Sequence, residues 1–212
     1  MSEKLGKIAD GLLHGKIEEV GELTQELIND GMDPEEILQK GLFAGMDIVG
    51  KKFRDCEMFI PEVLRSAKAM HAAMEKLRPV LSEESSSKAG TVIMVTVQGD
   101  LHDIGKNLAG MMMEGAGFNV IDMGIDRKTE DIVEMVKEKK PQILGLSALL
   151  TTTMPKMGEV INALKEAGIR DQVKVIVGGA PVTDDFAQEI GADAYAPNAS
   201  IGTEKALELV KG

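Results

Sequence analysis

Residues 91–107 read TVIMVTVQGDLHDIGKN, in which a run of apolar and β-branched residues is followed by a polar segment. The run predicts a strand buried on both faces, and the residues from Ile104 onward predict a helix. Three similar runs follow along the chain: FNVIDM at 118–123, QILGLSAL at 142–149 and VKVIVGG at 173–179. Further helices are expected from about Thr129, Met154, Thr183 and Ile201. This alternation predicts an α/β domain with an open, doubly wound parallel sheet and right-handed crossovers.

Residues 2–81 have a different pattern, in which apolar residues recur every three or four positions, as at Val20, Leu23 and Leu27. Spacing of this kind predicts amphipathic helices, and short connections favour a small antiparallel bundle of four. The polar segment SEESSSKAG predicts a hinge between the two halves. The expected organisation is an all-α helical cap domain at 1–81, a hinge linker at 82–90 and the sheet domain at 91–212.

The composition excludes several classes of partner and site. The formal net charge of -11 argues against nucleic acid or a membrane surface as a partner, because phosphate binding needs clustered Lys and Arg. Cys56 is the only cysteine, so an internal disulfide or a cysteine metal cage is excluded, and we expect a small buried residue there. No apolar run approaches the roughly 20 residues of a spanning helix, and no signal peptide is apparent. These features predict a cytoplasmic protein.

The loop after the first strand places His102 two residues after Asp100. Ligands of doubly wound sheets bind at the carboxyl ends of the strands. A neutral imidazole can bind a metal through one nitrogen while a carboxylate holds the other N–H. The alternative is an ordinary hydrogen-bonded loop histidine, with Asp103 capping the next helix. A phosphate-binding loop is disfavoured, because Lys106 is followed by asparagine and two carboxylates line the segment.

Three separated motifs agree with the predicted strand ends: Asp100-Leu101-His102-Asp103-Ile104-Gly105, Ser147-Ala148-Leu149 and Gly178-Gly179. In this order and spacing they resemble the cobalamin-binding signature D-x-H-x-x-G, S-x-L and G-G. The first half of the chain is similar to the helical cap of methionine synthase and of the corrinoid proteins of methanol and methylamine methyltransferase systems. The resemblance covers nearly the whole chain and implies a Rossmann-like, flavodoxin-like cobalamin-binding domain with five strands.

The resemblance also implies a role for each matching residue. His102 would be the lower axial ligand of cobalt in place of the corrinoid's own base, whose nucleotide tail would lie in a cleft beside the sheet. Asp100 and Thr153 would form a relay with His102, and Phe59 would cover the upper face. Cofactor contacts are implied for Gln98, Asp100, His102, Asp103, Ile104, Gly105, Ser147, Leu149, Thr151, Thr153, Gly178, Gly179, Ala199 and Phe59.

Several of these residues have structural alternatives. Phe59 also fits the core of the helical bundle, and the two glycines after the fourth strand also fit a simple strand end. Ser147 and Thr153 could bond only to nearby backbone. The run Met111-Met112-Met113 predicts helix packing rather than a cofactor site, although one methionine could border the tail.

The function implied by the resemblance is that of a methyl carrier. A methyl group on cobalt would pass between a substrate methyltransferase and a second methyltransferase with a thiol or pterin acceptor. The implied cofactor is cobalamin or a related corrinoid, bound as methylcobalamin with its own base off the cobalt and His102 on it, and a reductive activation protein is a further implied partner. Overall resemblance favours a methylamine as donor over methanol, a quaternary amine or an aryl methyl ether. The alternatives are a cobalamin-binding subunit of an adenosylcobalamin mutase and a corrinoid storage or sensor module.

Overall fold

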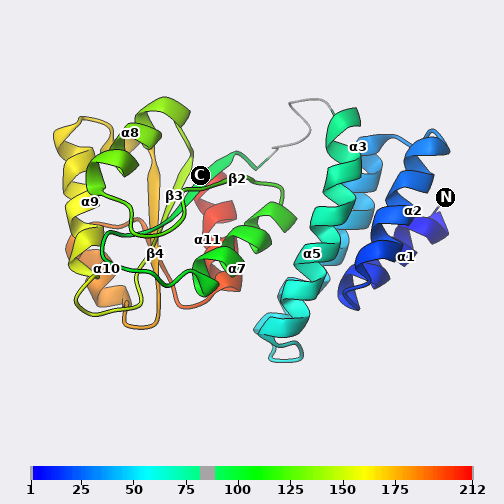
Figure 1. The fold of residues 1–212 in the computed structure, drawn as a ribbon, viewed down its shortest axis with the longest axis horizontal. Helices are drawn as coiled ribbons and strands as arrows, with labels where there is room; N and C mark the ends of the chain where they lie inside the picture. The colour runs from blue at the N-terminus through cyan, green and yellow to red at the C-terminus, as the bar shows by residue number, and fades with distance from the viewer. Residues whose placement is uncertain (1, 82–88, 212) are drawn as a thin grey trace. The chain divides into compact units, whose positions relative to one another are not determined.

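The computed structural model describes residues 2–81 and 89–211 (Figure 1). Its internal contacts divide the chain into two compact units, so that the helical unit comprises residues 1–88 with 114–117, and the sheet unit comprises residues 89–113 with 118–212. The division is therefore not a single cut in the sequence. Positions 82–88 of the predicted linker lie outside the described residues. Within the described ranges, no helix is long and apolar enough to cross a membrane.

The helical unit consists of helical segments at the places where the apolar spacing predicts them. Asp33 begins one of these segments as an N-cap, since its Oδ1 accepts a hydrogen bond from the backbone N–H of Glu35 at 3.1 Å. Fully buried aliphatic side chains, including Ile8, Leu27 and Leu42, form the core. The segments are α1 (Ser2–Leu13), α2 (Ile17–Asn29), a continuous stretch of α3 (Pro34–Glu36), the π-helix η1 (Ile37–Phe43) and α4 (Ala44–Arg54), then α5 (Ile60–Leu77) and the 3-10 turn η2 (Arg78–Val80).

Cys56 differs from the prediction of a small buried residue, because it is exposed. It follows the end of α4 with a left-handed φ of 59°, and its N–H donates to the carbonyl oxygen of Phe53 at 3.2 Å. A residue in this conformation turns the chain out of the helix. The exposure of Cys56 is therefore set by the geometry of the turn and not by the apolar character of its side chain.

The sheet unit is built on five parallel strands in the order β2-β1-β3-β4-β5. The strands are β1 (Thr91–Thr96), β2 (Asn119–Asp122), β3 (Ile143–Ser147), β4 (Lys174–Gly178) and β5 (Ala194–Ala196). This is the predicted flavodoxin-like order, in which the direction of strand progression reverses between β1 and β3. The helices are α7 (Ile104–Gly115), α8 (Thr129–Lys139), α9 (Pro155–Glu166), α10 (Asp184–Ile190) and α11 (Ala199–Lys211), with a 3-10 turn η3 (Arg170–Gln172).

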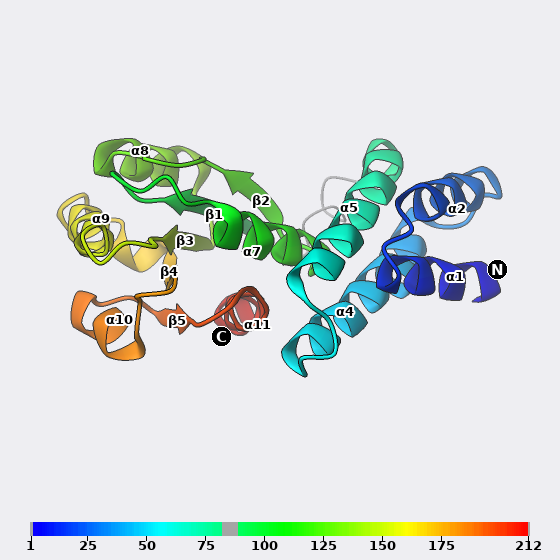
Figure 2. The same ribbon diagram turned by 60° about the horizontal axis from the view of Figure 1, so that its bottom comes forward.

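Helices cover both faces of this sheet, with α8, α9 and α10 on one face and α7 and α11 on the other (Figure 2). On the first face, Ile93 and Val95 of β1 belong to one apolar core with Ile132 of α8 and Leu164 of α9. The central strands are buried as predicted, whereas the residues of β2 are exposed or only partly buried. β2 is an edge strand with a neighbour on one side, which its apolar run does not reveal.

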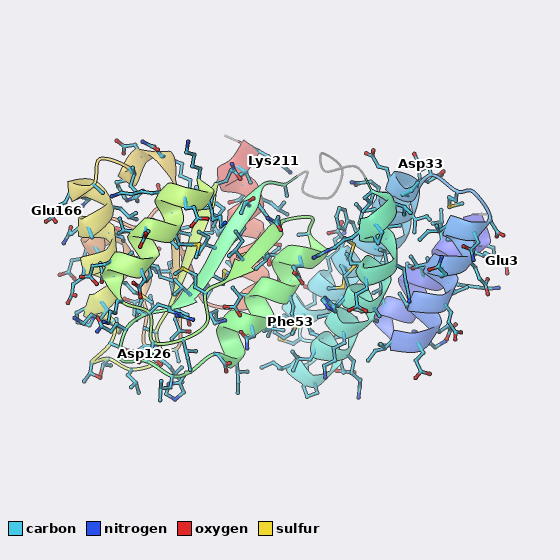
Figure 3. All side chains as sticks on the ribbon, turned by 45° about the horizontal axis from the view of Figure 1, so that its top comes forward. Glu3, Asp33, Phe53, Asp126, Glu166 and Lys211 are labelled. Atoms are coloured by element: carbon cyan, nitrogen blue, oxygen red, sulfur yellow. The ribbon has the colours of Figure 1, made fainter. Side chains whose placement is uncertain are left out.

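Charged side chains lie on the outside of both units, as Glu3, Asp126, Glu166 and Lys211 illustrate (Figure 3). In the sheet unit, the exposed large apolar side chains of Leu101, Ile104, Leu149 and Leu150 lie on the segments that follow β1 and β3.

Candidate functional site

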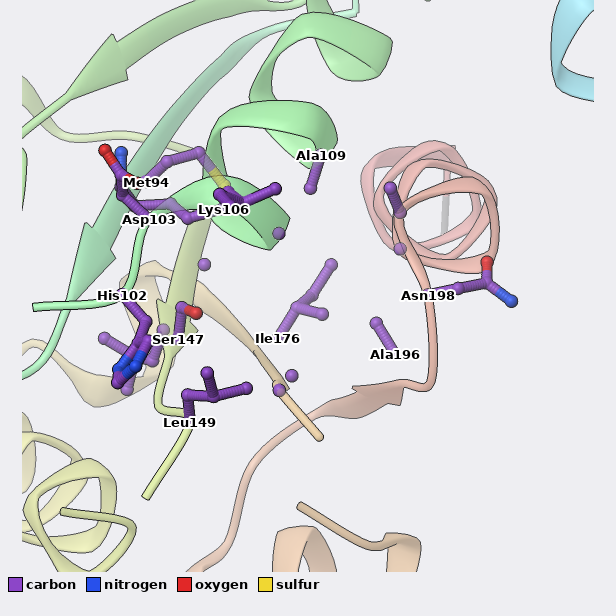
Figure 4. Close-up of a pocket in the computed structure, with 18 of the residues that line it drawn as sticks. Met94, His102, Asp103, Lys106, Ala109, Ser147, Leu149, Ile176, Ala196 and Asn198 are labelled. Atoms are coloured by element: carbon purple, nitrogen blue, oxygen red, sulfur yellow. The ribbon is translucent and has the colours of Figure 1, made fainter. Parts of the chain in front are cut away.

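A cleft of about 580 Å³ opens at the carboxyl ends of β1, β3 and β4, where the strand order reverses (Figure 4). All of its lining residues belong to the sheet unit. Its floor follows the strand register, with an outer row at the strand ends and an inner row two residues earlier. The outer row is Ser147, Gly178 and Ala196, and the inner row is Met94, Gly145 and Ile176.

The walls of the cleft come from the two helices on this face. On α7, Gly105, Ala109 and Met113 recur every four residues and so lie on one side of the helix. Ala199 and Gly202 of α11 line the opposite wall. Small residues on both helices leave the space between them open.

His102 stands at the mouth of this cleft, on the loop between β1 and α7. Its backbone is held by two hydrogen bonds: its N–H donates to Asp100 Oδ1 at 3.1 Å, and its carbonyl oxygen accepts from Thr96 Oγ1 at 2.9 Å. The ring nitrogen Nδ1 lies 2.8 Å from the same Asp100 oxygen. The side chain is 51% exposed, and Nε2 has no hydrogen bond to another described residue. One ring nitrogen is therefore fixed while the other is available to a ligand.

Asp100 is fully buried behind His102 and accepts several hydrogen bonds. Its Oδ2 accepts from Leu149 N–H at 2.7 Å, Leu150 N–H at 3.2 Å and Thr153 Oγ1 at 2.7 Å. Burial opposes ionisation, but the hydrogen bonds from Thr153, His102 and Leu149 outweigh it and hold the pKa of this carboxyl well below the usual range of an aspartate. Asp100 is thus a carboxylate that only accepts hydrogen bonds.

The charge on Asp100 decides the tautomer of His102. Because a carboxylate accepts and cannot donate, the imidazole hydrogen resides on Nδ1. The lone pair is then on Nε2, the nitrogen that can bind a metal, and the Asp100 contact fixes the orientation of the ring. Thr153 helps to keep Asp100 ionised and in place, since its hydroxyl donates a hydrogen bond to Asp100 Oδ2.

The donor set fits a metal that arrives inside a macrocycle better than a free ion. In the part of the chain that the structure describes, no group of three His, Cys, Asp or Glu side chains could hold a metal ion. A single imidazole suffices where a macrocycle fills the equatorial positions, as in haem proteins. Leu101, Ile104 and Leu149, which line the cleft at its mouth, are 67%, 71% and 41% exposed. Such an apolar rim is suited to cover the face of a large ring.

The three glycines of the motifs have different reasons to be glycine. At Gly179 the φ is +132°, and an added Cβ would lie 1.9 Å from the carbonyl oxygen of Ala148, so the fold itself requires glycine. At Gly178 the nearest atom to a Cβ is the carbonyl oxygen of Ala196 at 3.0 Å. At Gly105 a Cβ would meet no protein atom within 4 Å. Gly105 therefore leaves space in the cleft that a side chain would fill. At position 179, by contrast, the backbone at the strand end is enough to explain the glycine.

Most of the predicted contact residues line one cleft, although their binding roles stay predictions. Asp100 and Thr153 lie behind His102 and not on the cleft surface, while Gln98 and the exposed Thr151 lie outside the cleft. The predicted contact residues that line the cleft are His102, Asp103, Ile104, Gly105, Ser147, Leu149, Gly178, Gly179 and Ala199.

Phe59 belongs to the helical unit, where it begins α5 and its backbone N–H donates to Glu62 Oε2 at 2.9 Å. Its side chain is 66% exposed, so it is not part of the bundle core. Its contact with a corrinoid stays a prediction.

Sequence reasoning missed the inner part of the cleft. Its residues lie within strands or along helices, and the motifs mark only strand ends. Two signals could have found them: the four-residue spacing from Gly105 along α7, and the alternation of side chains along β1, β3 and β4. The missed residues include Met94, Lys106, Ala109, Gly145, Ile176 and Gly202, together with Met113, whose run was expected mainly to pack.

Comparison with known proteins agrees with this geometry. A B12 binding domain model matches residues 90–201, and a second B12 binding domain model matches residues 5–78. The chain is 44% identical over 200 residues to trimethylamine corrinoid protein 1 of Methanosarcina acetivorans, covering 93% of each chain. It is 48% identical over 180 residues to dimethylamine corrinoid protein 1 of the same organism, covering 84% of each.

A solved structure gives the same result at the level of the fold. The methanol:cobalamin methyltransferase complex MtaBC from Methanosarcina barkeri contains a chain that is 31% identical, with a TM-score of 0.90. The match covers 99% of this chain and 80% of that one. The chain therefore belongs to the family of corrinoid proteins that have a B12 binding domain.

Proposed function

We propose that this protein is a methyl carrier of a methylamine-type methyltransferase system, with His102 Nε2 as the lower axial ligand of the cobalt in its corrinoid. The observation that carries the proposal is the Asp100–His102 pair, which leaves one basic nitrogen free at the mouth of the cleft. A bound corrinoid supplies the cobalt atom that carries the methyl group. The relatives named for trimethylamine and dimethylamine support an amine as the methyl donor and leave open which amine it is.

The cleft and its rim account for the rest of the cofactor. Leu101, Ile104 and Leu149 are exposed at the mouth and would pack against the lower face of the corrin. The nucleotide tail, with its base displaced from cobalt by His102, would enter the cleft past Gly105. The volume of about 580 Å³ is within the range of small-molecule sites.

Asp100 and Thr153 would manage the proton of His102 during the carrier cycle. While His102 is bound to the metal, its only N–H faces Asp100. Whenever Nε2 is not bound to a metal and holds a proton, the Asp100 carboxylate would stabilise the resulting cation through a charge-assisted hydrogen bond. Thr153 keeps Asp100 ionised and in place for both states.

The proposed partners are other polypeptides. A substrate methyltransferase would deliver the methyl group, as the MtaBC complex suggests by analogy. A second methyltransferase would pass it to a thiol or pterin, and a reductive activation protein would restore the carrier after accidental oxidation.

Protein reconstituted with methylcobalamin should transfer its methyl group to a thiol when a cobalamin:thiol methyltransferase is added. The expected result is stoichiometric demethylation of the protein-bound cofactor, followed by its absorbance spectrum, and at least a tenfold slower reaction for Thr153→Val. Thr152→Val, at the exposed neighbouring position, serves as the matched control and should react at the wild-type rate.

Retention of adenosylcobalamin with radical rearrangement chemistry, and no methyl transfer, would support a mutase subunit instead. Tight binding without any transfer would support a storage or sensor module. Either result would overturn the carrier assignment.

A further inference from the structure

The inner end of the cleft differs in chemistry from its mouth. We call the residues Met94, Ala109, Met113, Gly145, Ile176 and Gly202 the inner cleft. None of their side chains carries an N–H or O–H group. Met94, Met113 and Ile176 are only 6%, 2% and 4% exposed, so a group placed among them would lose contact with bulk water.

The polar groups near the inner cleft are either already paired or lie too far from it. Gly145 and Ile176 pair with strands on both sides, and the N–H of Gly202 donates to the carbonyl oxygen of Asn198 at 3.0 Å. Lys106 also lines the cleft, but its ammonium group is paired with Asp122 at 2.5 Å and with the side chain of Asn107 at 2.6 Å. The Ser147 hydroxyl lies in the outer row, about 6–7 Å along the strands from the inner row.

We propose that the inner cleft selects corrinoids by the base of their nucleotide tail, favouring benzimidazole-type bases over purines. This rests on the proposed function, in which His102 displaces the base and the tail enters the cleft. The outer ring of a dimethylbenzimidazole is carbocyclic and needs no hydrogen bond. An adenine presents ring nitrogens and an amino group, which would lose their hydrogen bonds to water and gain none in the inner cleft.

The size of the preference follows from the same argument. Apolar pockets reject a polar analogue of similar shape by only about a hundredfold. We therefore expect the benzimidazole cobamide to bind about 10- to 100-fold more tightly than the adenine cobamide, once the cost of releasing each base from cobalt is removed.

The test compares three ligands on the full chain: cobalamin, the cobamide with adenine as its base, and cobinamide, which has no nucleotide. Dissociation constants come from the absorbance change on binding. Acid titration of each free cobamide gives its own base-release equilibrium, which is then subtracted. The affinity for cobinamide reports the contributions of His102 and the rim without that of the inner cleft.

A matched pair of variants locates the effect. Met113→Gln introduces an amide of similar size into the inner cleft, while Met111→Gln makes the same change on α7 outside the cleft. The ratio of adenine to benzimidazole affinity should rise at least fivefold in Met113→Gln and stay unchanged in Met111→Gln. Free-ligand properties cancel in this comparison. If Met113→Gln does not fold, the wild-type ratio alone decides.

The outcomes separate the inference from the function on which it rests. Equal corrected affinities for the two cobamides, or tighter binding of the adenine form, would refute selection by the inner cleft while the corrinoid-binding function stands. Failure to bind any of the three ligands would refute the proposed function itself.

Discussion

Replacing Asp100 with asparagine should lower the unfolding free energy of the sheet unit by about 2–4 kcal/mol and should also prevent the metal ligation proposed for His102. Asparagine has nearly the same shape, but one of its two acceptor oxygens becomes an NH₂ group. That group must face either His102 or the donors from Leu149 and Thr153. If it faces His102, the imidazole accepts at Nδ1 and carries its hydrogen on Nε2, so no lone pair is left for cobalt.

The stability of this variant can be read from a single chromophore. The chain has one tyrosine and no tryptophan, and Tyr195 lies in β5 of the sheet unit, so its fluorescence in a urea titration reports that unit. Asp103→Asn is the control on the same loop, where the carboxylate accepts one side-chain hydrogen bond from Asn107, and should cost about 1 kcal/mol or less. An equal loss in both variants would contradict the special role of Asp100.

Acidification should reduce the difference in unfolding free energy between the wild type and Asp100→Asn. The folded-state pKa of Asp100 is lowered, so its stabilisation is present above the unfolded-state pKa of about 3.9 and is lost as the pH falls below it. A difference that stays constant from neutral pH to pH 3 would show that the carboxylate charge is not what stabilises the site.

Replacing Gly179 with alanine should destabilise the sheet unit by about 3–6 kcal/mol, from backbone strain combined with overpacking. The new Cβ would lie 1.9 Å from the carbonyl oxygen of Ala148, and the φ of +132° disfavours any residue with a side chain. Backbone atoms cannot move aside as a flexible side chain would. The β3 and β4 ends must therefore separate, and the mouth of the cleft opens with them.

Gly105→Ala is the matched control for this prediction. Its Cβ would meet no protein atom within 4 Å, and Gly105 lies in the first turn of α7. Alanine should leave the unfolding free energy unchanged or raise it by up to about 1 kcal/mol. Corrinoid affinity should nevertheless fall, because the methyl group enters the cleft. Similar destabilisation by both substitutions, measured by Tyr195 fluorescence in urea, would contradict this distinction.

The sheet and its site differ in how far they could be predicted from sequence. Strand and helix positions and the Asp100–His102 loop follow from local patterns, since apolar runs and turn residues act within a few positions. The reversal of strand order is implied by the resemblance to cobalamin-binding domains and not by these local patterns. The motif D-x-H also predicts its own geometry, because two residues on one short loop can hydrogen-bond without help from the rest of the fold.

Features that depend on neighbours in space could not be predicted in this way. Thr151 and Thr153 occupy the same predicted loop, and only the turn after β3 decides that Thr153 faces Asp100 while Thr151 faces solvent. Gly105 and Gly179 are alike in sequence, yet the clash with Ala148 exists only once β3 and β4 are aligned. The edge position of β2 likewise depends on strand order.

The most direct test of the account is the electron paramagnetic resonance spectrum of the reconstituted protein with its cobalt reduced to cobalt(II), prepared with ordinary and with nitrogen-15 histidine. The chain has three histidines, and His14 and His71 remain in His102→Ala as internal controls. Ligation by His102 predicts a nitrogen triplet splitting that becomes a doublet on nitrogen-15 labelling and disappears in His102→Ala. A triplet that is unchanged by nitrogen-15 labelling of histidine would show that the corrinoid's own base stays on cobalt, and the assignment of His102 would be wrong.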